Sequence, residues 1–266
     1  MILAIGPFIG SFEQEVITFR PYVRWLYDVV PHNKIYINTH FNRKFLYDFI
    51  PEENIIPVYD YLTMNEDAQR GYVHKTVTLK DFNILTKEFK HSIIEKENCS
   101  YSDIKMYNIS YAKTTPHYPI YNKVFTPIQC FKQEYPEDVV YIPYGTSKKN
   151  MDKVYNFLYG KSIVIGDLKC KIKRDNKIIK RKDYPLYGPE LIMSYITNAK
   201  LVVCPISFWT TICNLQGVRV FSWGEGIGPY IKDGMYNFDN DKTHIYAVTK
   251  PDEVISLLEN VLKNIT

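Results

Sequence analysis

A loop at residues 145–149 combines residue types that bind phosphate groups. Its sequence, Gly-Thr-Ser-Lys-Lys, follows the apolar run 139–143 and precedes a helical pattern at 151–159. Backbone N–H groups, hydroxyls and one ammonium placed between a strand and a helix can hold a diphosphate. The loop is not a Walker loop, because the spacing G-x-x-x-x-G-K-[ST] is absent. An ordinary capped helix with solvent-exposed lysines is the alternative interpretation of the same residues.

A second set of polar and aromatic residues follows two predicted strands between 199 and 225. Residues 201–204 are uncharged and β-rich, which predicts a parallel strand buried on both faces. A short helix capped by Ser207 and ended by a glycine follows, and then another buried strand at 218–222. Ligands of such units bind beyond the carboxyl ends of the strands. We therefore expect a ligand near Pro205, Ser207, Trp223, Gly224 and Glu225.

Carboxylates gather at the start of the first predicted helix. Residues 2–5 indicate a short buried strand, and a loop containing Gly10 follows it. Glu13 and Glu15 would then occupy the first helical turn, where the helix dipole stabilises a negative charge. This stabilisation alone accounts for acidic residues at a helix start, so their position does not by itself require a chemical role.

The remaining periodicity predicts an α/β protein in two halves. Apolar runs predict further strands at 34–38, 55–59, 107–111, 162–165 and 246–248, and helical spacing predicts helices at 45–50, 79–98, 151–159, 189–198 and 252–265. The stretch 113–136 holds four prolines without periodicity, which indicates a linker. We therefore expect two domains, at 1–130 and 131–266.

The order of these motifs resembles that of the heptosyltransferase-like glycosyltransferases. In that family an "a-x-l-v-v" strand leads to a small-residue loop with Ser, a short helix, a Gly turn, and a strand ending in an aromatic residue and Gly, as in 199–224. This sequence differs in having Pro205 and Ile206 where Asp is usual, and Thr210 or Thr211 where His is common. The N-terminal opening resembles the family's "G-D-x-L-x-x-x-P" motif, and more closely an "E-F-G-x-E-L" opening of related glycosyltransferase-like proteins.

The resemblance implies the GT-B fold, which is an α/β architecture of two Rossmann-like domains facing across a cleft. The domain at 1–130 would offer the acceptor, and the domain at 131–266 would bind a nucleotide-sugar. Setting Pro21 against the family proline places Glu15 on the presumed general base of an inverting transfer, with Glu13 as the alternative. The expected donor-binding residues are Gly10, Gly145, Thr146, Ser147, Lys148, Pro205, Ser207, Thr210, Trp223, Gly224 and Glu225.

A transferase of this type needs no metal, because N–H groups, hydroxyls and lysines can neutralise the departing diphosphate. The sequence agrees in containing no D-x-D motif. We therefore expect no metal site and no cofactor apart from the nucleotide-sugar co-substrate.

Basic residues are concentrated at 169–182, where eight of them accompany one acid, Asp175. Two short alternating arms flank this acid, which predicts a protruding β-hairpin. A basic ribbon of this kind can bind nucleic acid, through Lys171, Lys173, Arg174, Lys177, Lys180 and Arg181. An anionic saccharide or lipid-linked acceptor is a second possibility, and a solvated surface without a partner is a third.

Composition limits the class of protein. The chain has 266 residues, a net charge of +4 and 45% hydrophobic residues, which suits a folded α/β protein. The five cysteines are scattered without a C-x-x-C pair, which indicates reduced thiols rather than a zinc site or a disulfide framework. No apolar run approaches a membrane span, and the first residues lack the basic region of a signal peptide. We expect a cytoplasmic protein; the abundance of Lys, Ile, Asn and Tyr resembles an AT-rich, viral coding sequence.

These observations favour a nucleotide-sugar-dependent glycosyltransferase. The acceptor is left open between a hydroxymethylated base in DNA, as in phage DNA glycosyltransferases, and a saccharide. A non-catalytic module that binds a nucleotide or glycan on the same fold is the main alternative. An epimerase-like or phosphorylase-like enzyme is a further one. The oligomeric state has no signature in the sequence.

Overall fold

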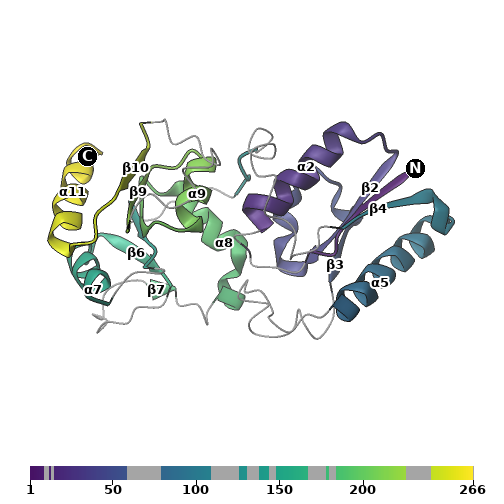
Figure 1. The fold of residues 1–266 in the computed structure, drawn as a ribbon, viewed down its shortest axis with the longest axis horizontal. Helices are drawn as coiled ribbons and strands as arrows, with labels where there is room; N and C mark the ends of the chain where they lie inside the picture. Colours follow the sequence, from purple (N-terminus) through teal and green to yellow (C-terminus); the bar gives the residue numbers. More distant parts are fainter. Residues whose placement is uncertain are drawn as a thin grey trace. The chain divides into compact units, whose positions relative to one another are not determined.

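The computed structural model describes residues 1–8, 12, 15–58, 79–108, 126–130, 138–143, 148–166, 178–179, 184–225 and 241–265. The chain divides into two compact units, Met1–Gln129 and Cys130–Thr266. Each is an α/β unit built on a parallel sheet, as the sequence predicted (Figure 1).

The sheet of unit 1 has the strand order β3-β2-β1-β4, and every pairing in it is parallel. Its strands are β1 (Ile2–Ile5), β2 (Lys34–His40), β3 (Ile55–Val58) and β4 (Ile104–Tyr107). The described helical segments are the π-helical η1 (Glu15–Phe19), α2 (Arg20–Val29), the 3₁₀ segments η2 (Phe41–Tyr47), η3 (Glu52–Asn54) and η4 (Tyr101–Asp103), and α5 (Leu79–Glu97).

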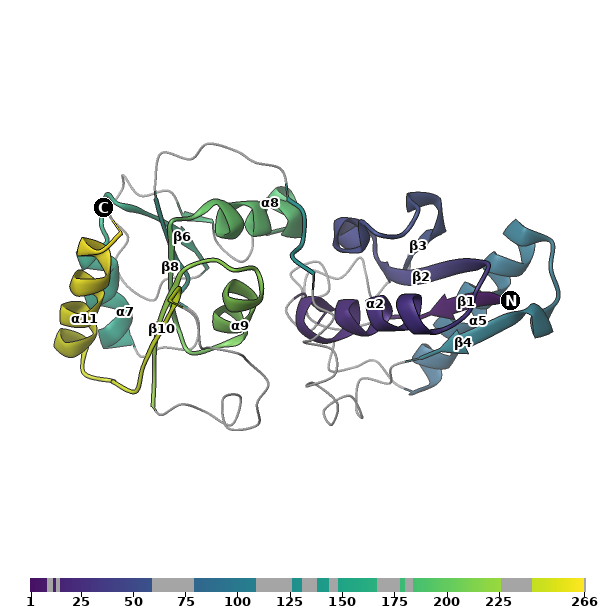
Figure 2. The same cartoon turned by 90° about the horizontal axis from the view of Figure 1, so that it is seen from above.

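Helices α2 and α5 lie on opposite faces of this sheet (Figures 1 and 2). On the α5 face, Phe89 and Ile93 pack with Ile2, Ala4 and Tyr36 in one buried cluster. The alternate residues of β1 point to the other face, because successive side chains of a strand alternate. Burial on both faces explains why the strands read as apolar runs rather than as alternating patterns.

The sheet of unit 2 has the order β10-β9-β8-β5-β6-β7, again with parallel pairings throughout. Its strands are β5 (Val139–Tyr141), β6 (Ser162–Ile165), β7 (Ile178–Ile179), β8 (Leu201–Pro205), β9 (Val220–Trp223) and β10 (Thr243–Tyr246). The described helices are α7 (Lys148–Phe157), α8 (Tyr184–Asn198), α9 (Phe208–Leu215) and α11 (Pro251–Lys263).

Helices α7 and α11 cover one face of the unit 2 sheet, and α8 and α9 cover the other (Figures 1 and 2). The α7 and α11 face is a large apolar core, in which Val154, Leu158, Val254 and Leu258 pack against residues of the central strands. Helices on both faces of a parallel sheet make unit 2 a doubly wound, Rossmann-like unit.

Several element boundaries differ from the sequence prediction. The strand expected at 107–111 is formed earlier, as β4, and the strand expected at 246–248 is formed at β10. Helix α8 begins before Pro189 rather than with it. Of the hairpin expected at 169–182, the structure describes Ile178 and Ile179, which form β7 parallel to β6 at the edge of the sheet. The other residues of this stretch lie outside the described residues.

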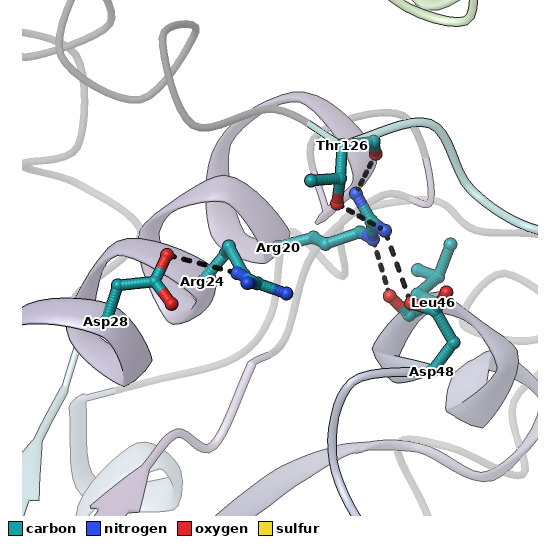
Figure 3. Close-up of polar contacts among 6 residues, drawn as sticks. All are labelled: Arg20, Arg24, Asp28, Leu46, Asp48 and Thr126. Carbon is teal, nitrogen blue, oxygen red and sulfur yellow. Dashed lines mark hydrogen bonds and ion pairs between the residues drawn. The ribbon is translucent and has the colours of Figure 1, made fainter.

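A buried arginine connects α2 to the end of unit 1 (Figure 3). The guanidinium of Arg20 donates to the carbonyl oxygen of Leu46 at 2.5 Å and to the carbonyl oxygen of Thr126 at 2.5 Å. It also contacts Asp48 at 3.4 Å and the Thr126 hydroxyl at 3.2 Å. Burial lowers the pKa of Arg20, and the nearby Asp48 carboxylate opposes that shift. Segment 126–130, which reaches the boundary between the units, is thereby fixed to unit 1.

Candidate functional site

The central feature of unit 2 is the point where its strand order reverses. Strands β5 and β8 are neighbours, but the chain continues from β5 towards β6 and from β8 towards β9. Tyr141 lies opposite Val203, and the N–H of Ile142 donates to the carbonyl oxygen of Val203 at 2.9 Å. The loops after β5 and β8 therefore leave the same edge of the sheet from adjacent strands. In doubly wound proteins, ligands bind at this switch point.

Ser207 begins helix α9 at the carboxyl end of β8. The N–H of Ser207 donates to the Thr210 hydroxyl at 3.1 Å, and the N–H of Thr210 donates to the Ser207 carbonyl oxygen at 3.1 Å. The N–H groups of a first helical turn have no partner within the helix ladder, so a helix start of this kind can bind an anion. Ser207 thus lies where the sequence placed it.

The buried hydroxyl of Thr210 contacts the ends of β8 and β9. Its hydroxyl lies 2.9 Å from the Ser222 hydroxyl and 3.7 Å from the Cys204 sulfur, and the side chains of all three residues are buried. Burial raises the pKa of the Cys204 thiol to about 11, so this thiol is neutral. These contacts link β8, β9 and α9, which gives Thr210 a role in positioning Ser207.

The residues at the end of β9 differ in exposure, from the buried Trp223 to the exposed Glu225. The Trp223 side chain is 1% exposed and belongs to the apolar core, while its carbonyl oxygen accepts the N–H of Ile206 at 2.9 Å. A Cβ on Gly224 would lie 3.3 Å from the Ile206 side chain, so the two loops approach closely here. Pro205 is the buried last residue of β8, and Glu225 is exposed. Glu225 alone of this group offers a charged side chain to solvent.

The loop after β5 is described at its two ends. Lys148 is the first residue of α7 and is exposed. Gly145, Thr146 and Ser147 lie outside the described residues, as do Gly10, Glu13 and the basic residues Lys171, Lys173, Arg174, Lys177, Lys180 and Arg181. The first turn of α7 is held to the start of α11, because the Asn150 side-chain amide donates to the Thr249 carbonyl oxygen at 2.9 Å.

The corresponding edge of unit 1 lies where β1 separates β2 from β4. The N–H of Gly6 donates to the carbonyl oxygen of Tyr107 at 3.0 Å, and the N–H of Phe8 donates to the carbonyl oxygen of Asn38 at 2.9 Å. Gly6 has φ +124°, and a Cβ there would lie 2.6 Å from the Asn38 carbonyl oxygen. Only glycine satisfies this close approach. Residues 6–8 therefore continue alongside β4 and β2 beyond the end of β1.

Glu15 is fully buried at this edge, as the first residue of η1. One carboxylate oxygen accepts hydrogen bonds from the Tyr47 hydroxyl at 2.7 Å and from the Thr39 hydroxyl, and the other pairs with Arg43 at 2.7 Å. Arg43 is itself 1% exposed. Burial, followed by the Glu15 charge, raises the pKa of Tyr47 well above its ordinary value. The structure thus makes Glu15 the centre of a buried ion-pair network.

Two polar residues at the end of β2 were missed by sequence reasoning, which ended this strand at Asn38. Thr39 supplies a hydroxyl to Glu15, and His40 is the last residue of the strand. Burial, followed by the charge of Arg43, lowers the pKa of His40 well below its ordinary value, so the imidazole is neutral. The available signal was a polar Thr-His pair directly after an apolar strand.

The described residues contain neither a cluster of metal-binding side chains nor a membrane-spanning helix. No cluster of three or more His, Cys, Asp or Glu side chains suitable for a metal ion occurs among them. None of the described helices has the length and apolar character needed to cross a membrane.

Comparison with known proteins places the chain among similar folds. No protein-family model and no curated protein matches it. A family 9 glycosyltransferase from Veillonella parvula DSM 2008 is similar with TM-score 0.49 and 11% identity, covering 100% of this chain and 89% of that one. E. coli ADP-heptose lps heptosyltransferase II gives TM-score 0.49 and 12% identity, covering 99% and 98%. A putative UDP-N-acetylglucosamine 2-epimerase from Listeria monocytogenes gives 0.48 and 10%, covering 99% and 88%.

The likeness concerns the fold alone, and the function proposed below rests on the chain's own residues and strand order.

Proposed function

We propose that this protein is a metal-independent glycosyltransferase that moves a sugar from a nucleotide-sugar to an acceptor hydroxyl. The observation that carries the proposal is the reversal of strand order between β5 and β8 in unit 2. The loops leaving these neighbouring strands lead to the starts of α7 and α9, at Lys148 and Ser207. The motif order that resembles heptosyltransferases covers both loops.

The donor's diphosphate binds, in this proposal, at the starts of α7 and α9. Free N–H groups and the positive end of each helix dipole attract phosphate oxygens. The exposed ammonium of Lys148 adds a positive charge at the first residue of α7. These groups stabilise the negative charge that develops on the departing diphosphate, which is the task a metal ion performs in other transferases.

The acceptor reaction needs a base, and unit 1 provides the carboxylate to which the resemblance points. The base takes the proton of the acceptor hydroxyl, the oxygen bonds to the anomeric carbon, and the bond to the diphosphate breaks with its electron pair leaving on the diphosphate. Glu15 accepts three hydrogen bonds. A catalytic Glu15 therefore has to exchange one of them for the acceptor hydroxyl, and Glu13 is the alternative base.

A panel of nucleotide-sugars tests the enzyme proposal, with release of nucleoside diphosphate as the readout. Lys148→Ala is expected to weaken nucleoside diphosphate binding about 10-fold, the equivalent of one charge-assisted contact. Lys161→Ala is the matched control, because Lys161 is also exposed but precedes β6, at the opposite edge of the sheet. Equal affinities in the two variants, or no diphosphate release from any donor, would contradict the proposal.

The acceptor is proposed to carry a free hydroxyl, either on a saccharide or on a hydroxymethylated base in DNA. The basic stretch 169–182 is the feature that favours DNA, because binding through many lysines and arginines releases counterions. Neutralising its six expected contact residues should abolish retention on DNA at low salt. Unchanged retention would remove DNA as the acceptor.

A non-catalytic binding module on the same fold is the second candidate. The hydrogen-bonded state of Glu15 favours it, as does the presence of Thr210 or Thr211 where His is common in the family. A protein that binds nucleoside diphosphates but releases none from nucleotide-sugars, with saccharide and DNA acceptors supplied, would support this candidate over the enzyme.

A further inference from the structure

The three hydrogen bonds that Glu15 accepts are divided unequally between its two oxygens. Oε1 accepts from two neutral hydroxyls, those of Thr39 and Tyr47, and Oε2 accepts from the guanidinium of Arg43. All four side chains are buried, and Glu15 is 0% exposed. A base must come within hydrogen-bond reach of the proton that it takes. One of the three donors therefore has to make room for an acceptor hydroxyl.

The Arg43 contact is the least suitable of the three for this exchange. Arg43 and Glu15 form an ion pair whose side chains are 1% and 0% exposed. Separating such a pair leaves an uncompensated charge in the protein interior, which is strongly destabilising. A buried carboxylate also needs a paired charge to stay ionised, and the ionised form is the one that can accept a proton. Arg43 therefore stays on Oε2, and the exchange takes place at Oε1.

Tyr47 is held on Oε1 by the packing of its aromatic ring. The ring lies edge-on to the rings of Phe19 and Phe49, with centroids 6.3 Å away in both cases. Burial, followed by the Glu15 charge, raises the pKa of Tyr47 well above its ordinary value, so the phenol stays protonated and remains a donor. The hydroxyl stands at the end of a rigid ring. It cannot leave Oε1 unless the whole buried ring moves.

Thr39 carries the hydroxyl that can leave with the smallest movement. It is the second-last residue of β2, at the carboxyl edge of the unit 1 sheet, where ligands of parallel sheets bind. Rotation about the Cα–Cβ bond to another staggered rotamer turns a threonine hydroxyl away without moving the backbone. An acceptor hydroxyl in its place substitutes one neutral donor for another, so Oε1 keeps the same number of hydrogen bonds.

We propose that Arg43 and Tyr47 are positioning residues for the proposed reaction, and that the acceptor hydroxyl takes the place of the Thr39 hydroxyl on Oε1 of Glu15. This inference rests on the proposed function and names the oxygen of the base that receives the proton. The proton passes from the acceptor oxygen to Oε1, while Arg43 on Oε2 and Tyr47 on Oε1 keep the carboxylate in one orientation. Both positioning residues belong to η2, so this segment orients the base.

Two nearly isosteric variants test the inference. Tyr47→Phe and Thr39→Val each remove one buried hydroxyl from the same oxygen of Glu15. A purely structural network predicts similar losses of turnover in the two variants. The inference predicts that Tyr47→Phe lowers kcat at least about 10-fold. Thr39→Val is expected to lower kcat by no more than about 3-fold, because its hydroxyl has left Oε1 in the transition state.

Turnover is measured with the full-length protein as release of nucleoside diphosphate from nucleotide-sugars, with neutral oligosaccharides and hydroxymethylated DNA supplied as acceptors. The KM for the nucleotide-sugar is expected to be the same in wild type and both variants, because the donor binds to unit 2 in the proposal. Arg43→Lys keeps a positive charge opposite Oε2 and should retain more activity than Arg43→Met. Chemical denaturation verifies that each variant folds, and if Arg43→Met does not, the comparison of Tyr47→Phe with Thr39→Val still tests the inference.

Three results would overturn the inference. These are equal losses of kcat in Tyr47→Phe and Thr39→Val, a larger loss in Thr39→Val, or a folded Tyr47→Phe protein with the kcat of wild type. Failure of the proposed function is recognised separately, because wild type then releases no diphosphate from any donor, and the inference fails with it.

Discussion

Replacing Glu15 tests whether this carboxylate holds unit 1 together. Glu15→Ala leaves Arg43 buried at 1% exposure without its counter-charge, and removes the acceptor of the Tyr47 and Thr39 hydroxyls. Breaking a buried ion pair by removing one partner costs about 3–5 kcal/mol. For a chain of this size that corresponds to a fall of roughly 6–20 °C in the unfolding temperature. Chemical denaturation and calorimetry of wild type and variant measure the two quantities.

A double-mutant cycle and a surface control complete this experiment. Glu15→Ala combined with Arg43→Met removes both charges, so the double variant should be more stable than the sum of the two single losses predicts. Glu52→Ala is the control, because Glu52 is 80% exposed and should change the unfolding free energy by no more than about 0.5 kcal/mol. A loss below about 1 kcal/mol for Glu15→Ala would refute the ion-pair reasoning.

The same variants separate a structural Glu15 from a catalytic one. Glu15→Gln keeps the shape of the side chain and an oxygen acceptor, so it should unfold at a higher denaturant concentration than Glu15→Ala. A folded Glu15→Gln protein that no longer releases nucleoside diphosphate identifies Glu15 as the base. A folded Glu15→Gln protein that still releases nucleoside diphosphate shows that Glu15 is not the base. The base is then Glu13, or no carboxylate at this helix start acts as a base.

Three further predictions concern other parts of the structure. Arg20→Met should lower the unfolding free energy by about 3 kcal/mol and speed amide hydrogen exchange in 126–130, since the buried guanidinium contacts are lost; unchanged exchange there would contradict the anchoring role. Gly6→Ala should cost at least about 2 kcal/mol in a urea titration, because its φ is +124° and a Cβ would clash with a carbonyl oxygen; a neutral effect would contradict the close approach. Cys204, with its pKa raised to about 11, should resist iodoacetamide at pH 8 while the part-exposed Cys99 reacts, as measured by mass spectrometry; rapid Cys204 alkylation in the folded protein would show that the thiol is accessible.

Local signals in the sequence predicted much of the fold. The unit from β8 to β9 follows from an apolar run, a proline, a capping serine and a glycine, all of which act within a few residues. Gly217 ends α9 with φ +69°, as glycine does at helix ends. The expected parallel α/β class is confirmed by the two sheets, because strands buried on both faces leave a continuous apolar run that can be recognised directly.

Contacts between distant residues could not be predicted in this way. Glu15 and Arg43 are 28 positions apart, and Arg20 and Thr126 are 106 positions apart, so no local pattern joins them. The helix dipole explains an acid near residue 15 but gives no information on its partner. The hairpin at 169–182 was predicted from its alternating arms, and the pairing of Ile178 and Ile179 with β6 was not part of that prediction, because β6 lies outside the stretch.

The most direct test of the central claim is a crystal structure of the full-length protein soaked with nucleoside diphosphates. The proposal predicts that the diphosphate lies at the carboxyl edge of the unit 2 sheet, between the loops that follow β5 and β8, in contact with the starts of α7 and α9. A diphosphate bound at the opposite edge of this sheet, or no binding at saturating concentrations, would contradict it.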